Sequence, residues 1–134
     1  MKHTFYLLVS SCLLLFSCHS TDTIPNTDID VARAFIKDIQ QSNFKQAEKL
    51  LLREETNNQY FDRFEEHFKS RPAKELEQYR NSDIIINEMS NVSDSVTVVN
   101  YSNSFNTAEK NKIKVVRING QWLVDLKYTF SGNL

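Results

Sequence analysis

The chain has 134 residues, with 16 basic and 17 acidic side chains and a formal net charge of −1 at pH 7. Because no run of like charge stands out, we expect neither a nucleic acid nor an anionic membrane surface as a partner. With only two glycines the chain offers no glycine-rich phosphate-binding loop, and its length fits a single small domain.

The N-terminus is a short basic region followed by an apolar run from Phe5 to Phe16. Roughly a dozen apolar residues match a secretory signal and fall short of the ~20 that cross a bilayer as a helix. We therefore expect export, with residues 1–17 as a signal peptide.

The apolar run ends in Leu15-Phe16-Ser17-Cys18, which resembles the bacterial lipobox. In proteins with this motif the cysteine receives a diacylglyceryl group, the signal is cut before it, and the new amino terminus is usually acylated. The resemblance implies that Cys18 is the lipidation site and, with palmitate-like chains, holds the protein to the membrane. His19 after the cysteine, where some sorting patterns have Asp, implies the outer membrane of the cell envelope.

Two other ways of processing the N-terminus remain open. The segment from Val9 to Cys12 fits the same four-residue pattern, but cutting there would leave only about five apolar residues before the cut. An ordinary export signal cut near Ser20 would leave a protein without a lipid.

Residues 18–27 are polar, contain Pro25 and show no periodicity, so we expect a flexible tether before a single domain over 28–134. Cys12 and Cys18 are the two cysteines of the chain. If Cys12 leaves with the signal and Cys18 is lipidated, the domain has no disulfide, no cysteine nucleophile and no cysteine-based zinc site. No metal-ligand spacing or cofactor motif is present.

Apolar residues at helical spacing predict three amphipathic helices in the first half of the domain. The predicted ranges are 28–41, 44–53 and 56 to Pro72, with a further turn or two over 73–79. Thr27 and Asp28 provide an N-terminal cap, and Ser42-Asn43 separates the first two helices.

The second half of the domain changes to the two-residue period of strands. The predicted strands are Ile84–Ile86, Val96–Tyr101, Lys112–Ile118 and Gln121–Tyr128, with a turn over Ser90 to Asp94. Asn119-Gly120 between the last two strands predicts a type I′ hairpin turn.

A two-residue turn fixes the pairing of this hairpin. The pairs are Ile118 with Gln121, Arg117 with Trp122, Val116 with Leu123, Val115 with Val124, Lys114 with Asp125 and Ile113 with Leu126. Alternation then predicts an inner face of Ile113, Val115, Trp122, Val124 and Leu126. On the outer face we expect an exposed Lys114–Asp125 pair and an apolar spot formed by Val116 and Leu123.

About three N-terminal helices followed by about four antiparallel strands predict an α+β fold in which a curved sheet wraps around the helices. Three segments carry a resemblance: Ala32 to Ile36, Ser42 to Ala47 with Leu50-Leu51, and Val115 to Val124 with its N-G-x-W strand end. They resemble small bacterial lipoproteins of a family whose function is not established, a domain of unknown function. That family belongs with the nuclear-transport-factor-two-like, or cystatin-like, α+β cone fold. The usual Gly-Asp between the first helices is Ser42-Asn43 here.

The resemblance implies that the open end of the cone is a pocket. Its expected lining is Phe61, Phe64, Phe68, Trp122, Tyr101 and Tyr128, and the tyrosines at 60, 79, 101 and 128 are candidates for its mouth. His67 is the only histidine of the domain, and its position between Phe64 and Phe68 is typical of an ordinary helix-edge residue. We therefore predict no catalytic residue.

Three functions follow, in order of preference. The first is a non-catalytic binding or accessory module that holds a small apolar ligand or a peptide in the cone. The second is a structural or interaction lipoprotein with a filled core, which forms a homodimer through the outer sheet face. The third is an enzyme that uses the cone pocket. The choice between the first two depends on whether aromatic side chains fill the cone.

Overall fold

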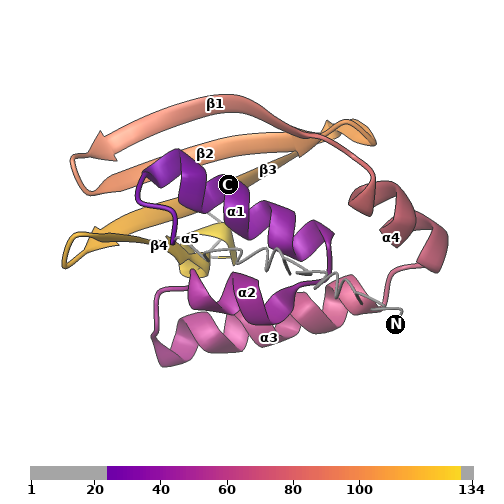
Figure 1. Ribbon diagram of the computed structural model, residues 1–134, viewed down its shortest axis with the longest axis horizontal. Coiled ribbons are helices and arrows are strands. Elements are labelled where there is room, and N and C mark those ends of the chain that lie inside the picture. Colours follow the sequence, from indigo (N-terminus) through magenta and orange to yellow (C-terminus); the bar gives the residue numbers. More distant parts are fainter. Residues whose placement is uncertain (1–23, 131–134) are drawn as a thin grey trace, which may run out of the picture.

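The computed structural model describes residues 24–130, which form five helices and one four-stranded antiparallel sheet (Figure 1). The predicted α+β class is therefore confirmed. The predicted signal peptide and Cys18 lie outside the described residues. Among residues 24–130, no helix combines the length and apolar composition that crossing a membrane requires.

The predicted helices are present with small changes of boundary. They are α1 Asp28–Gln40, α2 Phe44–Lys49, α3 Glu55–Lys69 and α4 Ala73–Arg80. As predicted, Thr27 caps α1, and its side chain accepts a hydrogen bond from the Asp30 N–H at 3.2 Å. The predicted second helix ends early, at Lys49, because the next residues pair with a strand: the Leu52 N–H donates to Val124 and the Val124 N–H to Leu50.

The break between α1 and α2 is a tight helix end. Asn43 N–H donates to the Asp38 carbonyl at 2.7 Å and Ser42 N–H to the Ile39 carbonyl at 2.9 Å, which is the Schellman pattern. Ser42 occupies the left-handed position of this pattern with φ 61°, where glycine is the usual residue. The predicted interruption of the helices at Ser42-Asn43 thus has a backbone cause.

The sheet is a simple meander in the order β1-β2-β3-β4. Its strands are β1 Ile84–Ser93, β2 Val96–Asn103, β3 Asn106–Ile118 and β4 Gln121–Asp125. Strands β1, β2 and β3 extend beyond their predicted ranges, and β1 shifts register twice, between Ile86 and Glu88 and between Asn91 and Ser93. The turn predicted over Ser90 to Asp94 is therefore wrong in extent, because β1 continues to Ser93.

The end of the predicted fourth strand is also wrong. The chain leaves the sheet after Asp125 and forms α5, Leu126–Phe130. The Asp125 carboxylate accepts a hydrogen bond from the Lys127 N–H at 3.1 Å, which satisfies a free donor in the first turn of α5. A capping side chain at this position explains the change from strand to helix.

The predicted register of the β3–β4 hairpin is confirmed for the five pairs from Ile118–Gln121 to Lys114–Asp125. The predicted sixth pair, Ile113 with Leu126, is not formed, because Leu126 begins α5. Asn119 and Gly120 both have positive φ, at 51° and 82°, as a type I′ turn requires. The expected exposure of the Lys114–Asp125 pair is wrong, since Asp125 is only 5% exposed where α5 begins. On the outer face Val116 is 8% exposed and Leu123 half-buried, so the expected apolar spot presents little surface.

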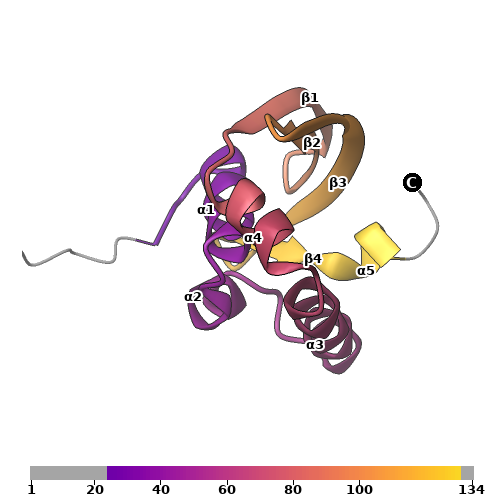
Figure 2. The same cartoon turned by 90° about the vertical axis from the view of Figure 1, so that its right-hand side faces the viewer.

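The sheet is strongly curved, and α1 lies against its concave side and contacts all four strands (Figure 2). Helices α2 and α3 pack beyond α1 and close the core through rings of Phe35, Phe44, Phe61 and Phe68, whose centroids lie 5.8 to 6.5 Å apart. Each buried ring contributes about 1.5–3 kcal/mol. The helices that the sequence predicts to be amphipathic and the inner face of the sheet thus share one apolar core.

Candidate ligand cavity

One cavity of about 70 Å³ lies where α1, α3, α4 and the strands β2 and β3 meet. Its lining is Phe35, Ile36, Ile39, Gln40, Phe64, Phe68, Arg71, Tyr79, Tyr101, Asn103, Glu109 and Asn111. We call this space the aromatic cavity. It combines rings and aliphatic side chains with a few polar groups, the usual composition of a small-molecule site.

The periodicity of each element brings these residues together. Phe64 and Phe68 are four residues apart on α3 and therefore share a face. On β2 and β3, the alternate residues Tyr101 and Asn103, and Glu109 and Asn111, point to one side of the sheet. The cavity is thus built from one face of each element.

An arginine, a tyrosine and a glutamate form the polar wall of the aromatic cavity. The Tyr79 hydroxyl donates to the Glu109 carboxylate at 3.1 Å, and the Arg71 guanidinium lies 4.8 Å from the Tyr79 ring centroid. Arg71 also donates to Glu75 at 3.0 Å. Burial by itself lowers the pKa of Arg71, but its hydrogen bond with Tyr79 and the charges of Tyr79, Glu75 and Glu109 raise the pKa above its ordinary value. Arg71 therefore stays cationic.

Gln40 belongs to the wall of the aromatic cavity and carries a buried, unpaired acceptor. The residue is 4% exposed, and its Nε2 donates to the Ser82 hydroxyl at 3.2 Å, while its Oε1 has no hydrogen-bond partner. The Ser82 hydroxyl itself donates to the Tyr79 carbonyl at 2.7 Å, so it accepts from Gln40, and the amide orientation follows. A buried carbonyl oxygen without a donor costs about 1–3 kcal/mol.

Tyr101 lines the opposite, strand side of the aromatic cavity. Burial, together with the nearby Tyr79 and Glu109, raises the pKa of the Tyr101 phenol well above its ordinary value, against the smaller effect of Arg71. The phenol is therefore uncharged at neutral pH and presents a neutral hydroxyl.

The structure brings together only part of the predicted lining. Phe64, Phe68 and Tyr101 line the aromatic cavity, as does Tyr79 among the tyrosines considered for its mouth. Phe61 is instead buried in the core between Phe35 and Phe44.

The two remaining predicted residues lie elsewhere. Trp122 lies in a shallow surface depression with Asp28 and Thr97. The ring of Tyr128 lies 5.8 Å from the Lys114 ammonium. Neither residue is among those that line the aromatic cavity.

Sequence reasoning missed Gln40, Arg71 and Glu109. Glu109 lies in β3 before the predicted start of the strand at Lys112. The sequence therefore does not indicate that Glu109 and Asn111 share a face of the sheet. Gln40 follows Ile36 by four residues on the buried stripe of α1, which is the signal that could have identified it.

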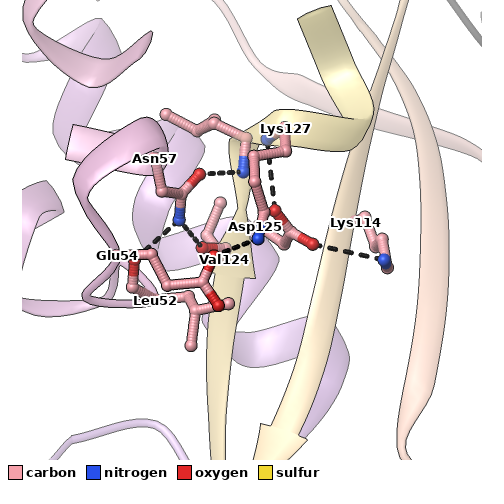
Figure 3. Close-up of polar contacts among 8 residues, drawn as sticks. Leu52, Glu54, Asn57, Lys114, Val124, Asp125 and Lys127 are labelled. Atoms are coloured by element: carbon pink, nitrogen blue, oxygen red, sulfur yellow. Dashed lines mark hydrogen bonds and ion pairs between the residues drawn. The ribbon is translucent and has the colours of Figure 1, made fainter. Parts of the chain in front are cut away.

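A second buried polar group, Asn57, serves the fold (Figure 3). Its Nδ2 donates to the carbonyls of Leu52 at 2.7 Å and Val124 at 3.2 Å, and its Oδ1 accepts from the Leu126 N–H at 2.7 Å. Beside it, Asp125 accepts from Lys114, and Lys127 pairs with Glu54. Because backbone groups occupy the amide of Asn57, this cluster joins the start of α3 to the end of β4.

The other candidate catalytic and metal-binding side chains of the described residues do not form a site. His67 is exposed on α3 and lies outside the lining of the aromatic cavity. Within residues 24–130, no three side chains of His, Cys, Asp or Glu are grouped so that they could hold a metal ion. The aromatic cavity, whose lining combines aromatic rings with Gln40, Arg71 and Glu109, is therefore the candidate site.

No protein-family model matches the chain, and no curated protein or solved structure matches it.

Proposed function

We propose that the protein is a lipid-anchored lipoprotein of the bacterial cell envelope whose domain is a non-catalytic module that binds a small ligand in the aromatic cavity. The observation that carries the binding proposal is that Gln40, whose buried Oε1 has no hydrogen-bond partner, belongs to the lining of a cavity with aromatic rings. A ligand that donates a hydrogen bond would remove the cost of that orphaned oxygen.

The size of the aromatic cavity limits what it takes. Its volume of about 70 Å³ is small beside the ~300–1,000 Å³ of sites that enclose a drug-sized ligand. The proposed ligand is therefore either a molecule of a few heavy atoms or the end group of a longer molecule. The remainder of a longer molecule would extend out of the cavity into solvent.

The proposed anchor has its support in the sequence. Leu15-Phe16-Ser17-Cys18 has the pattern of a lipobox, and a diacylated or triacylated Cys18 would leave the membrane at a negligible rate. The ten or so residues before α1 would let the domain reach roughly 15–20 Å from the bilayer. By the residue after Cys18, we place the protein in the outer membrane.

Two experiments test the proposal. The first compares Cys18→Ser with the matched variant Cys12→Ser by detergent phase separation. Cys18→Ser should move the protein to the aqueous phase or leave it unprocessed, and Cys12→Ser should leave it in the detergent phase. A Cys18→Ser protein that is processed and still partitions with detergent contradicts the anchor.

The second experiment is native mass spectrometry of protein extracted from its own membranes. We expect a bound small molecule that is lost in Asn111→Phe, which fills the aromatic cavity, and kept in Thr107→Phe, an exposed position on the same strand. A ligand kept by both variants would show that binding occurs elsewhere.

A further inference from the structure

The charges around the aromatic cavity do not cancel. Arg71 is offset by Glu75, to which it donates at 3.0 Å. Among the described residues Glu109 makes no ion pair, although its charge acts on Arg71 from a distance. Its hydrogen-bond partners are neutral: the Tyr79 hydroxyl at 3.1 Å and the Asn106 amide at 3.3 Å. One carboxylate charge is therefore left at the wall.

The acceptor groups of the residues that line the cavity favour a ligand that donates hydrogen bonds. Gln40 Oε1 can only accept, and a carboxylate such as Glu109 can only accept. The rings of Phe64, Phe68, Tyr79 and Tyr101 present π faces or edges to the same space. Aromatic faces attract organic cations, more strongly where water is excluded.

We propose that the aromatic cavity recognises the ammonium end of a primary amine, with Gln40 Oε1 accepting one N–H and Glu109 supplying the counter-charge. This inference rests on the proposed function of the cavity as a ligand site and adds the chemical class of the ligand. An ammonium group has three donors and a compact shape, which fits about 70 Å³ and leaves the alkyl or peptide remainder of the ligand outside.

The test uses three probes of equal length and different head group: n-butylammonium, butan-1-ol and butyrate. Each is titrated into the full-length protein in micelles of a nonionic detergent, and binding is followed by the NMR ring signals of Tyr101, assigned from Tyr101→Phe. We expect butylammonium to bind in the millimolar range and about tenfold more tightly than either other probe, because it alone carries the charge that Glu109 attracts.

Two variants separate charge from hydrogen bonding. Glu109→Gln should weaken butylammonium binding by about tenfold and leave butan-1-ol binding within about twofold. Glu77→Gln, which removes an exposed carboxylate of α4 outside the cavity lining, is the matched control and should change neither. Gln40→Met, which keeps the length of the side chain and removes Oε1, should weaken butylammonium binding.

The outcomes distinguish the two proposals. If butyrate or butan-1-ol shifts the Tyr101 signals at equal or lower concentration than butylammonium, the ammonium inference is overturned and the binding module stands. If Glu109→Gln and Glu77→Gln weaken butylammonium binding equally, the role of Glu109 is overturned. If none of the probes shifts Tyr101, both the inference and the proposed function of the cavity are overturned.

Discussion

Replacing Asn57 with leucine tests the buried cluster that joins α3 to the end of β4. Asn57 is completely buried, and its amide makes three hydrogen bonds to backbone groups of Leu52, Val124 and Leu126. Leucine has nearly the same shape and can make none of these bonds. The side chain keeps its packing while its hydrogen bonds are lost.

The expected loss in the free energy of unfolding depends on which backbone groups keep a hydrogen-bond partner in Asn57→Leu. The Leu52 carbonyl still accepts from the Glu54 N–H, and the Val124 carbonyl from the Leu52 N–H. The Leu126 N–H loses its acceptor in a buried position, which costs about 1–3 kcal/mol, and two further hydrogen bonds contribute about 0.5–1.5 kcal/mol each. We therefore expect Asn57→Leu to lower the free energy of unfolding by about 3 kcal/mol and the Tm by about 12–15 °C for a domain of this size.

The assay is thermal and urea unfolding followed by circular dichroism. Asn58→Leu, at an exposed neighbouring position of α3, is the control and should lie within about 0.5 kcal/mol of the parent protein. Hydrogen exchange should also show faster exchange of the Leu126 amide in Asn57→Leu. An Asn57→Leu protein as stable as the Asn58→Leu protein would refute the reasoning that these bonds hold the end of β4.

Three further predictions concern the backbone and the cavity. Ser42→Gly should raise the free energy of unfolding by about 0.5–1 kcal/mol, because φ 61° strains a serine, while Ser42→Ala should change it little in the same urea titrations. Gly120→Ala should lower it by about 1–2 kcal/mol although the space is open, because φ 82° disfavours any Cβ; an unchanged urea midpoint would contradict this. Because the pKa of Tyr101 is raised in the folded state, this phenol ionises first in the unfolded state. The free energy of unfolding therefore keeps its full value below about pH 10 and falls above it, by about 1.4 kcal/mol at about pH 11. Tyr101→Phe should remove that part of the fall between about pH 8 and pH 11, and equal falls in both proteins would refute the assignment.

The parts of the fold that the sequence predicts well depend on local pattern. Val31, Phe35 and Ile39 recur at helical spacing and do form the buried stripe of α1. The β3–β4 register follows from Asn119-Gly120 alone, because a two-residue turn determines every pair after it.

The predictions are wrong where contacts between residues far apart in the sequence determine the local structure. The segment after Lys49 leaves its helix to pair with Val124, and the stretch from Thr107 to Lys110 is strand although its residues lack an apolar alternation. At the cavity, aromatic type was enough to select Phe64, Phe68 and Tyr101. Gln40 and Glu109 line the same cavity only because α1 packs on the curved sheet, and sequence spacing does not reveal that packing.

The pairing of residues 50–52 with β4 helps to protect one border of the sheet from pairing with another chain. Hydrogen bonds to Leu50 and Leu52, at 2.8 and 2.9 Å, occupy the two backbone groups of Val124 on the outer edge of the last strand. At the opposite border, the two irregularities of β1 interrupt the row of backbone groups that another chain would copy. If the protein is held to a membrane as proposed, its copies would meet often, and this sheet would offer them no straight template on which fibrils could grow.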